Sequence, residues 1–160
     1  MVESEMRPAI DEWLNRNGYY AAHECLVGGW CDVIGCMWSE RIGRRRPELL
    51  EMICVELKML KISDVIYQAH GNHYHCNLSY CAMPKRTVDR MRAKTIDKFI
   101  SAKVGLLSVK DYDVKTIVFS QYRNEQPHTI FRDRLWSFKL RHKKLIEAVS
   151  PPVVIGTKGD

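Results

Sequence analysis

The sequence predicts an α/β fold in which a mixed β-sheet is flanked by helices. Segments with the spacing of amphipathic helices alternate with short apolar segments typical of strands. The chain has 160 residues, of which 46% are hydrophobic, and this is enough for one ordinary core. We therefore expect a single domain over residues 1–150 and a flexible tail over 151–160, after Pro151 and Pro152.

The first elements expected are a helix and a β-hairpin. Between Met6 and Leu14 apolar residues recur at intervals of four, three and one, which predicts a helix from about Glu5 to Arg16. Apolar segments over 20–27 and 30–38 then flank a Gly28-Gly29 turn. This arrangement is typical of a hairpin.

The remaining patterns follow in the order strand, helix, strand, helix, strand, strand and helix. The connection before them, residues 41–48, is basic and contains both glycine and proline. The expected bounds are 49–58, 62–69, 77–82, 87–103, 104–109, 114–119 and 129–149. Residues 70–75 are expected as a loop, and the final helix is long and basic.

Composition also bears on localisation. No apolar segment approaches the roughly 20 residues that a membrane-spanning helix needs, and the polar, acidic N-terminus does not resemble a signal peptide. The 6 cysteines include no Cys-x-x-Cys pair, so we expect reduced thiols and not a disulfide scaffold. These features predict a cytoplasmic protein without a membrane partner.

The chain carries a net charge of +6, which favours polyanionic partners such as nucleic acid. Two segments, 85–103 and 132–144, each carry a net charge of +5. An inert, solvated basic surface is the alternative interpretation. If the second segment is a helix, Arg134, Arg141 and Lys144 share one side and are candidates to contact phosphates. Arg44, Arg45 and Arg46 in the basic connection are further candidates.

Three residues predict a site for a hard metal ion. Alternation along the strand at 49–58 places Glu56 and Lys58 on one face, opposite Val55 and its apolar neighbours. Asp32 lies within an apolar strand of the hairpin, where a lone carboxylate needs a cation, hydrogen bonds or water. Two carboxylates beside a lysine suit Mg²⁺, which prefers oxygen ligands and retains several waters.

These motifs, in their order, resemble the PD-(D/E)xK nuclease superfamily over about residues 1–119. The resemblance is carried by Gly29-x-x-Asp32, by Glu56-x-Lys58, and by the segments 78–84 and 104–109. The resemblance implies a restriction-endonuclease-like fold and hydrolysis of phosphodiester bonds in DNA through metal-activated water. An endonuclease that uses Mg²⁺ or Mn²⁺ is the expected activity.

The resemblance also implies roles for individual residues. Asp32, Glu56 and the backbone carbonyl of Leu57 match the metal ligands of the superfamily. Lys58 matches the residue that orients the attacking water or stabilises charge on the phosphorus. The first motif lacks the proline that often precedes the aspartate, and the segment after residue 119 lies outside the resemblance.

Two further residues match positions that only some branches use: Glu5 on the first helix and Gln68 on the second. Each residue also has an ordinary structural interpretation. Glu5 suits the first turn of any helix, and Gln68 suits a solvated surface. Glu56 and Lys58 could form a surface pair, and Asp32 could hydrogen-bond to the turn that follows Gly29.

Other functions are also compatible with the sequence. A non-catalytic nucleic-acid-binding module with the same fold is the main alternative. Histidines and cysteines also gather at His70, His73, His75, Cys76 and Cys81. Their spacing fits no standard zinc finger, so we expect a loop with buried cysteines there. A homodimer is expected if both strands of a duplex are cut, since one site cuts one strand.

Overall fold

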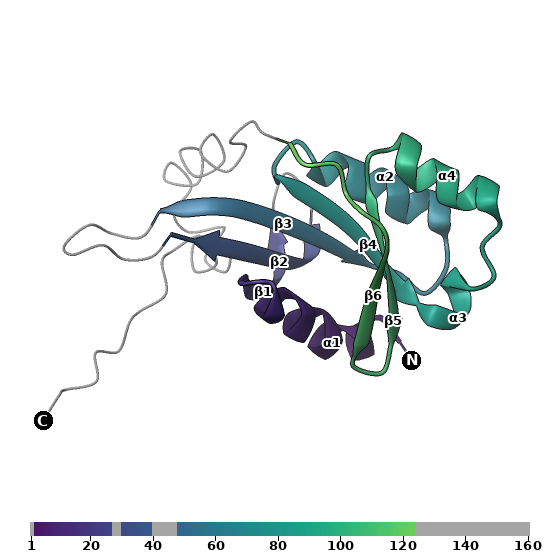
Figure 1. Ribbon diagram of the computed structural model, residues 1–160, viewed down its shortest axis with the longest axis horizontal. Coiled ribbons are helices and arrows are strands. Elements are labelled where there is room, and N and C mark those ends of the chain that lie inside the picture. Colours follow the sequence, from purple (N-terminus) through teal and green to yellow (C-terminus); the bar gives the residue numbers. More distant parts are fainter. Residues whose placement is uncertain (1, 27–29, 40–47, 124–160) are drawn as a thin grey trace, which may run out of the picture.

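A computed structural model describes residues 2–26, 30–39 and 48–123. Within these residues a six-stranded sheet is accompanied by four helices (Figure 1). The helices are α1 (Glu3–Arg16), α2 (Ile62–Asn72), α3 (Lys85–Val88) and α4 (Ala93–Ser101). The strands are β1 (Tyr20–Leu26), β2 (Trp30–Trp38), β3 (Leu49–Leu57), β4 (Leu78–Pro84), β5 (Gly105–Lys110) and β6 (Asp113–Val118).

The strands lie in the sheet in the order in which they occur in the chain. The pairs β1–β2, β2–β3 and β5–β6 are antiparallel, whereas β3–β4 and β4–β5 are parallel. A parallel neighbour requires a crossover connection, which α2 supplies between β3 and β4, and α3 with α4 between β4 and β5. The predicted α/β class and mixed sheet are therefore confirmed.

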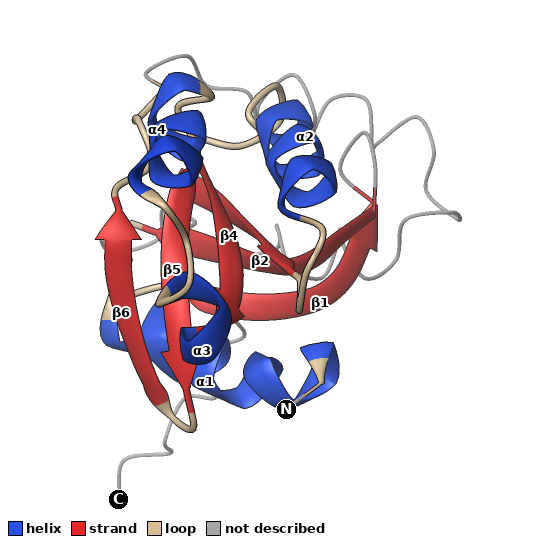
Figure 2. Ribbon diagram, turned by 90° about the vertical axis from the view of Figure 1, so that its right-hand side faces the viewer, coloured by secondary structure: helices blue, strands red, loops and turns tan. Residues whose placement is uncertain are grey.

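The sheet is covered on both faces. α1 lies on one side and α2 and α4 lie on the other (Figure 2). Along β3 the side chains alternate between the two faces: Ile53, Val55 and Leu57 join the core beneath α1, whereas Cys54 belongs to a cluster on the other face. The same alternation places Glu56 on the face that α2 covers.

Two predicted helices differ from the structure. The segment expected as one helix over 87–103 is two helices, because the backbone of Arg92 is extended and interrupts the helical path. α2 continues to Asn72, so the loop expected over 70–75 begins three residues later. The helix predicted over 129–149 and the tail predicted over 151–160 lie outside the described residues.

The expectation of reduced thiols is wrong at one pair, because Cys54 and Cys76 form a disulfide. The chain returns from α2 to the start of β4 and brings the two Cα atoms to 6.3 Å, a separation that a disulfide spans. Reduced cysteines were one of the three features behind the cytoplasmic prediction, and this bond removes that feature. Within the described residues, no helix is both long and apolar enough to cross a membrane.

Candidate functional site

The centre of the candidate site is a pair of carboxylates on adjacent strands. In the antiparallel β2–β3 pair Val33 lies opposite Val55, and one step farther along this register Asp32 lies opposite Glu56. The two side chains share one face of the sheet. Glu56 is 2% exposed, whereas Asp32 is partly exposed. The structure therefore brings together the two acids that the sequence predicted as metal ligands.

Neighbouring groups fix one oxygen of each carboxylate. The side-chain amide of Asn72, at the end of α2, donates a 2.6 Å hydrogen bond to Oε1 of Glu56. The backbone N–H of Leu57 donates a 2.8 Å hydrogen bond to Oδ2 of Asp32. The side chain of Leu57 itself is buried beneath α1. Both carboxylates are thus held in defined orientations by the end of β3 and the end of α2.

The electrostatics of this pair are dominated by burial. Burial raises the pKa of Glu56 to about 7, and the negative charge of Asp32 contributes to the rise. The hydrogen bond from Asn72 and the charge of Lys58 act in the opposite direction. The fully buried Cys81 lies opposite Glu56 on β4 and contributes to its apolar surroundings. A bound cation would stabilise the ionised forms of both carboxylates, because it offsets their mutual repulsion and the cost of burial.

The donor chemistry of the pair fits a divalent cation that prefers oxygen. Mg²⁺ is commonly held by one or two carboxylates while it retains several waters. Among residues 2–26, 30–39 and 48–123, no three or more His, Cys, Asp and Glu side chains gather closely enough to form a protein-only metal cage. Asp32 and Glu56 are therefore the two described side chains at this point that could serve as ligands of such an ion.

Lys58 directly follows β3 and is positioned by both its backbone and its side chain. Its N–H donates a 3.1 Å hydrogen bond to the carbonyl of Ala82 on β4. Its ammonium nitrogen Nζ lies 3.6 Å from Oε2 of Glu3, at the start of α1. Since its charge also lowers the pKa of Glu56, Lys58 lies within electrostatic range of the carboxylate pair.

Glu5 lies in the first turn of α1 and interacts with the backbone there. The Glu5 carboxylate accepts a 2.7 Å hydrogen bond from the backbone N–H of Val2, and this bond holds the pKa of Glu5 below its ordinary value. Glu5 therefore satisfies an amide at the beginning of α1. The acid that contacts Lys58 is Glu3, two residues earlier.

On α2 the residue that reaches the carboxylates is Asn72, not Gln68. Gln68 is exposed and lies one helical turn before Asn72. The sequence did not lead to Asn72, because the helix predicted there ends at Ala69. A spacing of four residues from Gln68 was the signal that could have identified it.

The histidine and cysteine cluster does not form a zinc site among the described residues. The ring N–H groups of His70 and His73 donate to the backbone carbonyls of Ala102 and Lys103, at 3.1 Å and 2.8 Å. Cys76 is oxidised in the disulfide. The two histidines therefore tie the end of α2 to the segment that follows α4.

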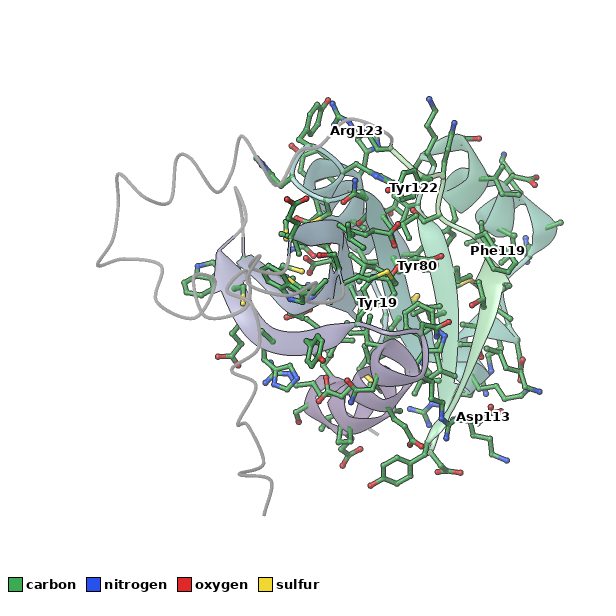
Figure 3. The ribbon with its side chains drawn as sticks, turned by 60° about the vertical axis from the view of Figure 1, so that its left-hand side comes forward. Tyr19, Tyr80, Asp113, Phe119, Tyr122 and Arg123 are labelled. Carbon is green, nitrogen blue, oxygen red and sulfur yellow. A yellow bond between two sulfur atoms is a disulfide. The ribbon has the colours of Figure 1, made fainter. Side chains whose placement is uncertain are left out.

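A third carboxylate, Glu51, lies among tyrosines on the opposite face of β3. The hydroxyl of Tyr19 donates a hydrogen bond to Oε1 of Glu51, and burial together with the charge of Glu51 raises the pKa of Tyr122. Figure 3 shows Tyr19, Tyr80 and Tyr122 on this side of the molecule. Burial and the charge of Glu51 raise the pKa of Tyr19. This cluster attaches the segment after β6 to the sheet and is separate from the site around Glu56.

The basic residues predicted to contact nucleic acid are not located by the structure. Arg44, Arg45 and Arg46 fall within residues 40–47, and Arg134, Arg141 and Lys144 fall after residue 123. Both segments lie outside the described residues. These assignments stay predictions.

Comparison with known proteins identifies a structural relative but no family. No protein-family model and no curated protein matches the sequence. Among solved structures, the chain is similar to the SPO1766 protein of unknown function from Silicibacter pomeroyi. That match has a TM-score of 0.57 and 14% identity, and it covers 88% of each chain. At this identity the likeness concerns the fold alone.

Proposed function

We propose that this chain is a metal-dependent nuclease of restriction-endonuclease-like fold that hydrolyses phosphodiester bonds in DNA. The observation that carries the proposal is the pairing of Asp32 with Glu56 across β2 and β3, with Lys58 two residues farther along the chain. An acid pair and an adjacent ammonium combine the two requirements of phosphodiester hydrolysis, which are positioning and neutralisation of charge.

In this proposal Asp32, Glu56 and the carbonyl of Leu57 hold Mg²⁺ or Mn²⁺. The bound ion would neutralise phosphate charge and lower the pKa of a coordinated water. The chain's own contribution is geometric: β2 and β3 fix the spacing of the carboxylates, and Asn72 fixes Oε1 of Glu56. These restraints keep the two acids in place before substrate arrives.

Lys58 is proposed to act on the water or on the developing negative charge. Its side chain is 24% exposed, so the ammonium can reach a bound phosphate while it stays anchored by Glu3. An ammonium in this position would lower the barrier through an interaction that strengthens as charge develops. Lys58 is therefore a catalytic residue in this proposal, whereas Asn72 is a positioning residue.

A panel of labelled DNA substrates tests the proposal. Linear duplex, nicked, flapped, four-way and single-stranded DNA would each be incubated with Mg²⁺, with Mn²⁺ or with a chelator. We expect metal-dependent cleavage of at least one substrate by the wild-type protein and by the exposed-acid control Asp97→Asn. We expect none with Asp32→Asn. Binding without cleavage on every substrate would favour the non-catalytic module instead.

A further inference from the structure

We infer that a cleft lined by Arg86, Arg90 and Arg92 binds the phosphate backbone of DNA and leads it to Lys58. The inference rests on the proposed nuclease function and names the surface that receives its substrate. The three arginines belong to the basic segment 85–103 and to the described residues, whereas the basic residues that the sequence analysis named individually lie outside the described residues.

The cleft begins beside the candidate active site. It has a volume of about 590 Å³ and is bounded by the β3–α2 connection on one side and by α3 and the start of α4 on the other. The hydroxyl of Thr87 donates a 3.0 Å hydrogen bond to the carbonyl of Met59, which joins the two sides. Met59 and Leu60 line the cleft and directly follow Lys58. The two sites are therefore adjacent along the chain and at the same end of β3.

The arginines of the cleft are available for an anionic ligand. All three are exposed, and within the described residues none of them makes an ion pair or a side-chain hydrogen bond. Their neighbour Lys85 is instead paired with Asp89 at 2.5 Å. Among the described residues that line the cleft, none is acidic. Its positive charge is therefore uncompensated by these groups.

The chemistry of the lining favours a chain of phosphates over a single small anion. A guanidinium can donate two parallel hydrogen bonds to one phosphate, so three arginines can serve several phosphates along a strand. The surrounding segment 85–103 carries a net charge of +5, which attracts a polyanion over a longer range. Because Met59 and Leu60 line the cleft and directly follow Lys58, a strand bound there lies beside the end of β3 that carries Lys58.

The test measures binding separately from cleavage. Wild-type protein and the triple variant Arg86→Gln, Arg90→Gln, Arg92→Gln would be titrated, in chelator, against labelled duplex and single-stranded DNA of about 20 nucleotides per strand over a range of salt concentrations. The matched control removes three exposed lysines outside the cleft: Lys98→Gln, Lys110→Gln and Lys115→Gln. Circular dichroism would show that each variant is folded.

We expect the triple variant to bind at least roughly tenfold more weakly at low salt. On duplex DNA its salt slope should fall by roughly 0.9 for each phosphate that the variant leaves unneutralised. The lysine control is expected to keep most of its affinity. Equal weakening in both variants, unchanged binding in the arginine variant, or no DNA binding by wild-type protein would overturn the inference. If only the arginine variant binds DNA more weakly and the wild-type protein cuts no substrate, the result would support the cleft as a DNA-binding surface and refute the proposed nuclease activity.

Discussion

The side-chain amide of Asn72 donates a 2.6 Å hydrogen bond to Oε1 of Glu56, the carboxylate that lies opposite Asp32 on the neighbouring strand. This bond connects the end of α2 to the candidate catalytic strand. It stabilises the ionised form of Glu56 against the effects of burial and of the neighbouring acid. The crossover helix thereby helps to set both the orientation and the charge of the site.

Replacing Asn72 with alanine should shift the pH dependence of cleavage. Without the amide donor the pKa of Glu56 rises, so the acidic limb of the pH–rate profile should move to higher pH. Cleavage rates would be measured from pH 5 to pH 9. We expect Asn72→Ala to be much slower than wild type at pH 6 and closer to the wild-type rate at pH 9. Asn15→Ala, an exposed change on α1, is the control. A deficit that is equal at every pH would indicate a purely structural role for Asn72.

Glu56 should also make the stability of the protein depend on pH. Its ordinary pKa of 4.5 rises to about 7 on folding, so between these values the native state binds a proton that the unfolded state has released. The free energy of unfolding therefore contains a favourable contribution below pH 4.5, which is lost as the pH rises through 7. Relative to wild type, Glu56→Gln should gain about 2–3 kcal/mol between pH 5 and pH 8. Urea unfolding of both proteins at pH 5 and pH 8 measures this change. If the difference in the free energy of unfolding between variant and wild type is the same at both pH values, the prediction is wrong.

Lys58→Ala should reduce turnover without a comparable effect on metal binding. Loss of one electrostatic group that acts on the reacting atoms lowers the rate by roughly 10²–10³-fold. The metal concentration that gives half-maximal rate should stay within about threefold, since the ammonium is not a ligand. Lys58→Arg should recover only part of the rate, because the planar guanidinium places its charge differently. Single-turnover kinetics, with Lys98→Ala as the control variant, would measure these rates. An unchanged rate in Lys58→Ala would refute the catalytic role of Lys58.

The Cys54–Cys76 disulfide should stabilise the fold. It closes a loop with a sequence separation of 22 residues, for which the loss of unfolded-state entropy predicts about 3 kcal/mol. Denaturant unfolding with and without reductant measures the effect. The double variant Cys54→Ala, Cys76→Ala should match the reduced wild type and should not respond to reductant. Identical unfolding of the wild type under both conditions would contradict the prediction.

The carboxylate pair was predictable from the sequence because local patterns determine it. Two apolar segments on either side of a Gly-Gly sequence predict the hairpin, and alternation along β3 assigns Glu56 to the face opposite Val55. Asp32 and Glu56 could then be placed on adjacent strands without knowledge of distant contacts. The order of the six strands was equally predictable, because each strand is a short apolar segment of its own, whereas the helix expected over 87–103 is two helices.

Tertiary contacts determined what the sequence could not predict. Glu3 and Glu5 both belong to the first turn of α1, and only the packing of α1 against the sheet selects Glu3 as the partner of Lys58. Asn72 belongs to a polar segment that resembles a loop, although it is helical where it packs on Glu56. The disulfide joins a strand to the far end of a crossover, and its two cysteines show no local motif.

The most direct test of the proposed nuclease is cleavage of labelled DNA by wild-type protein, Glu56→Gln and the control Glu12→Gln, each with Mn²⁺ or with chelator. Glu56→Gln preserves size and the acceptor for Asn72 but removes the charge that would hold a metal ion. We predict metal-dependent cleavage by wild type and control, none in chelator, and a rate at least roughly 10²-fold lower in Glu56→Gln. Cleavage by Glu56→Gln at the wild-type rate would contradict the proposal.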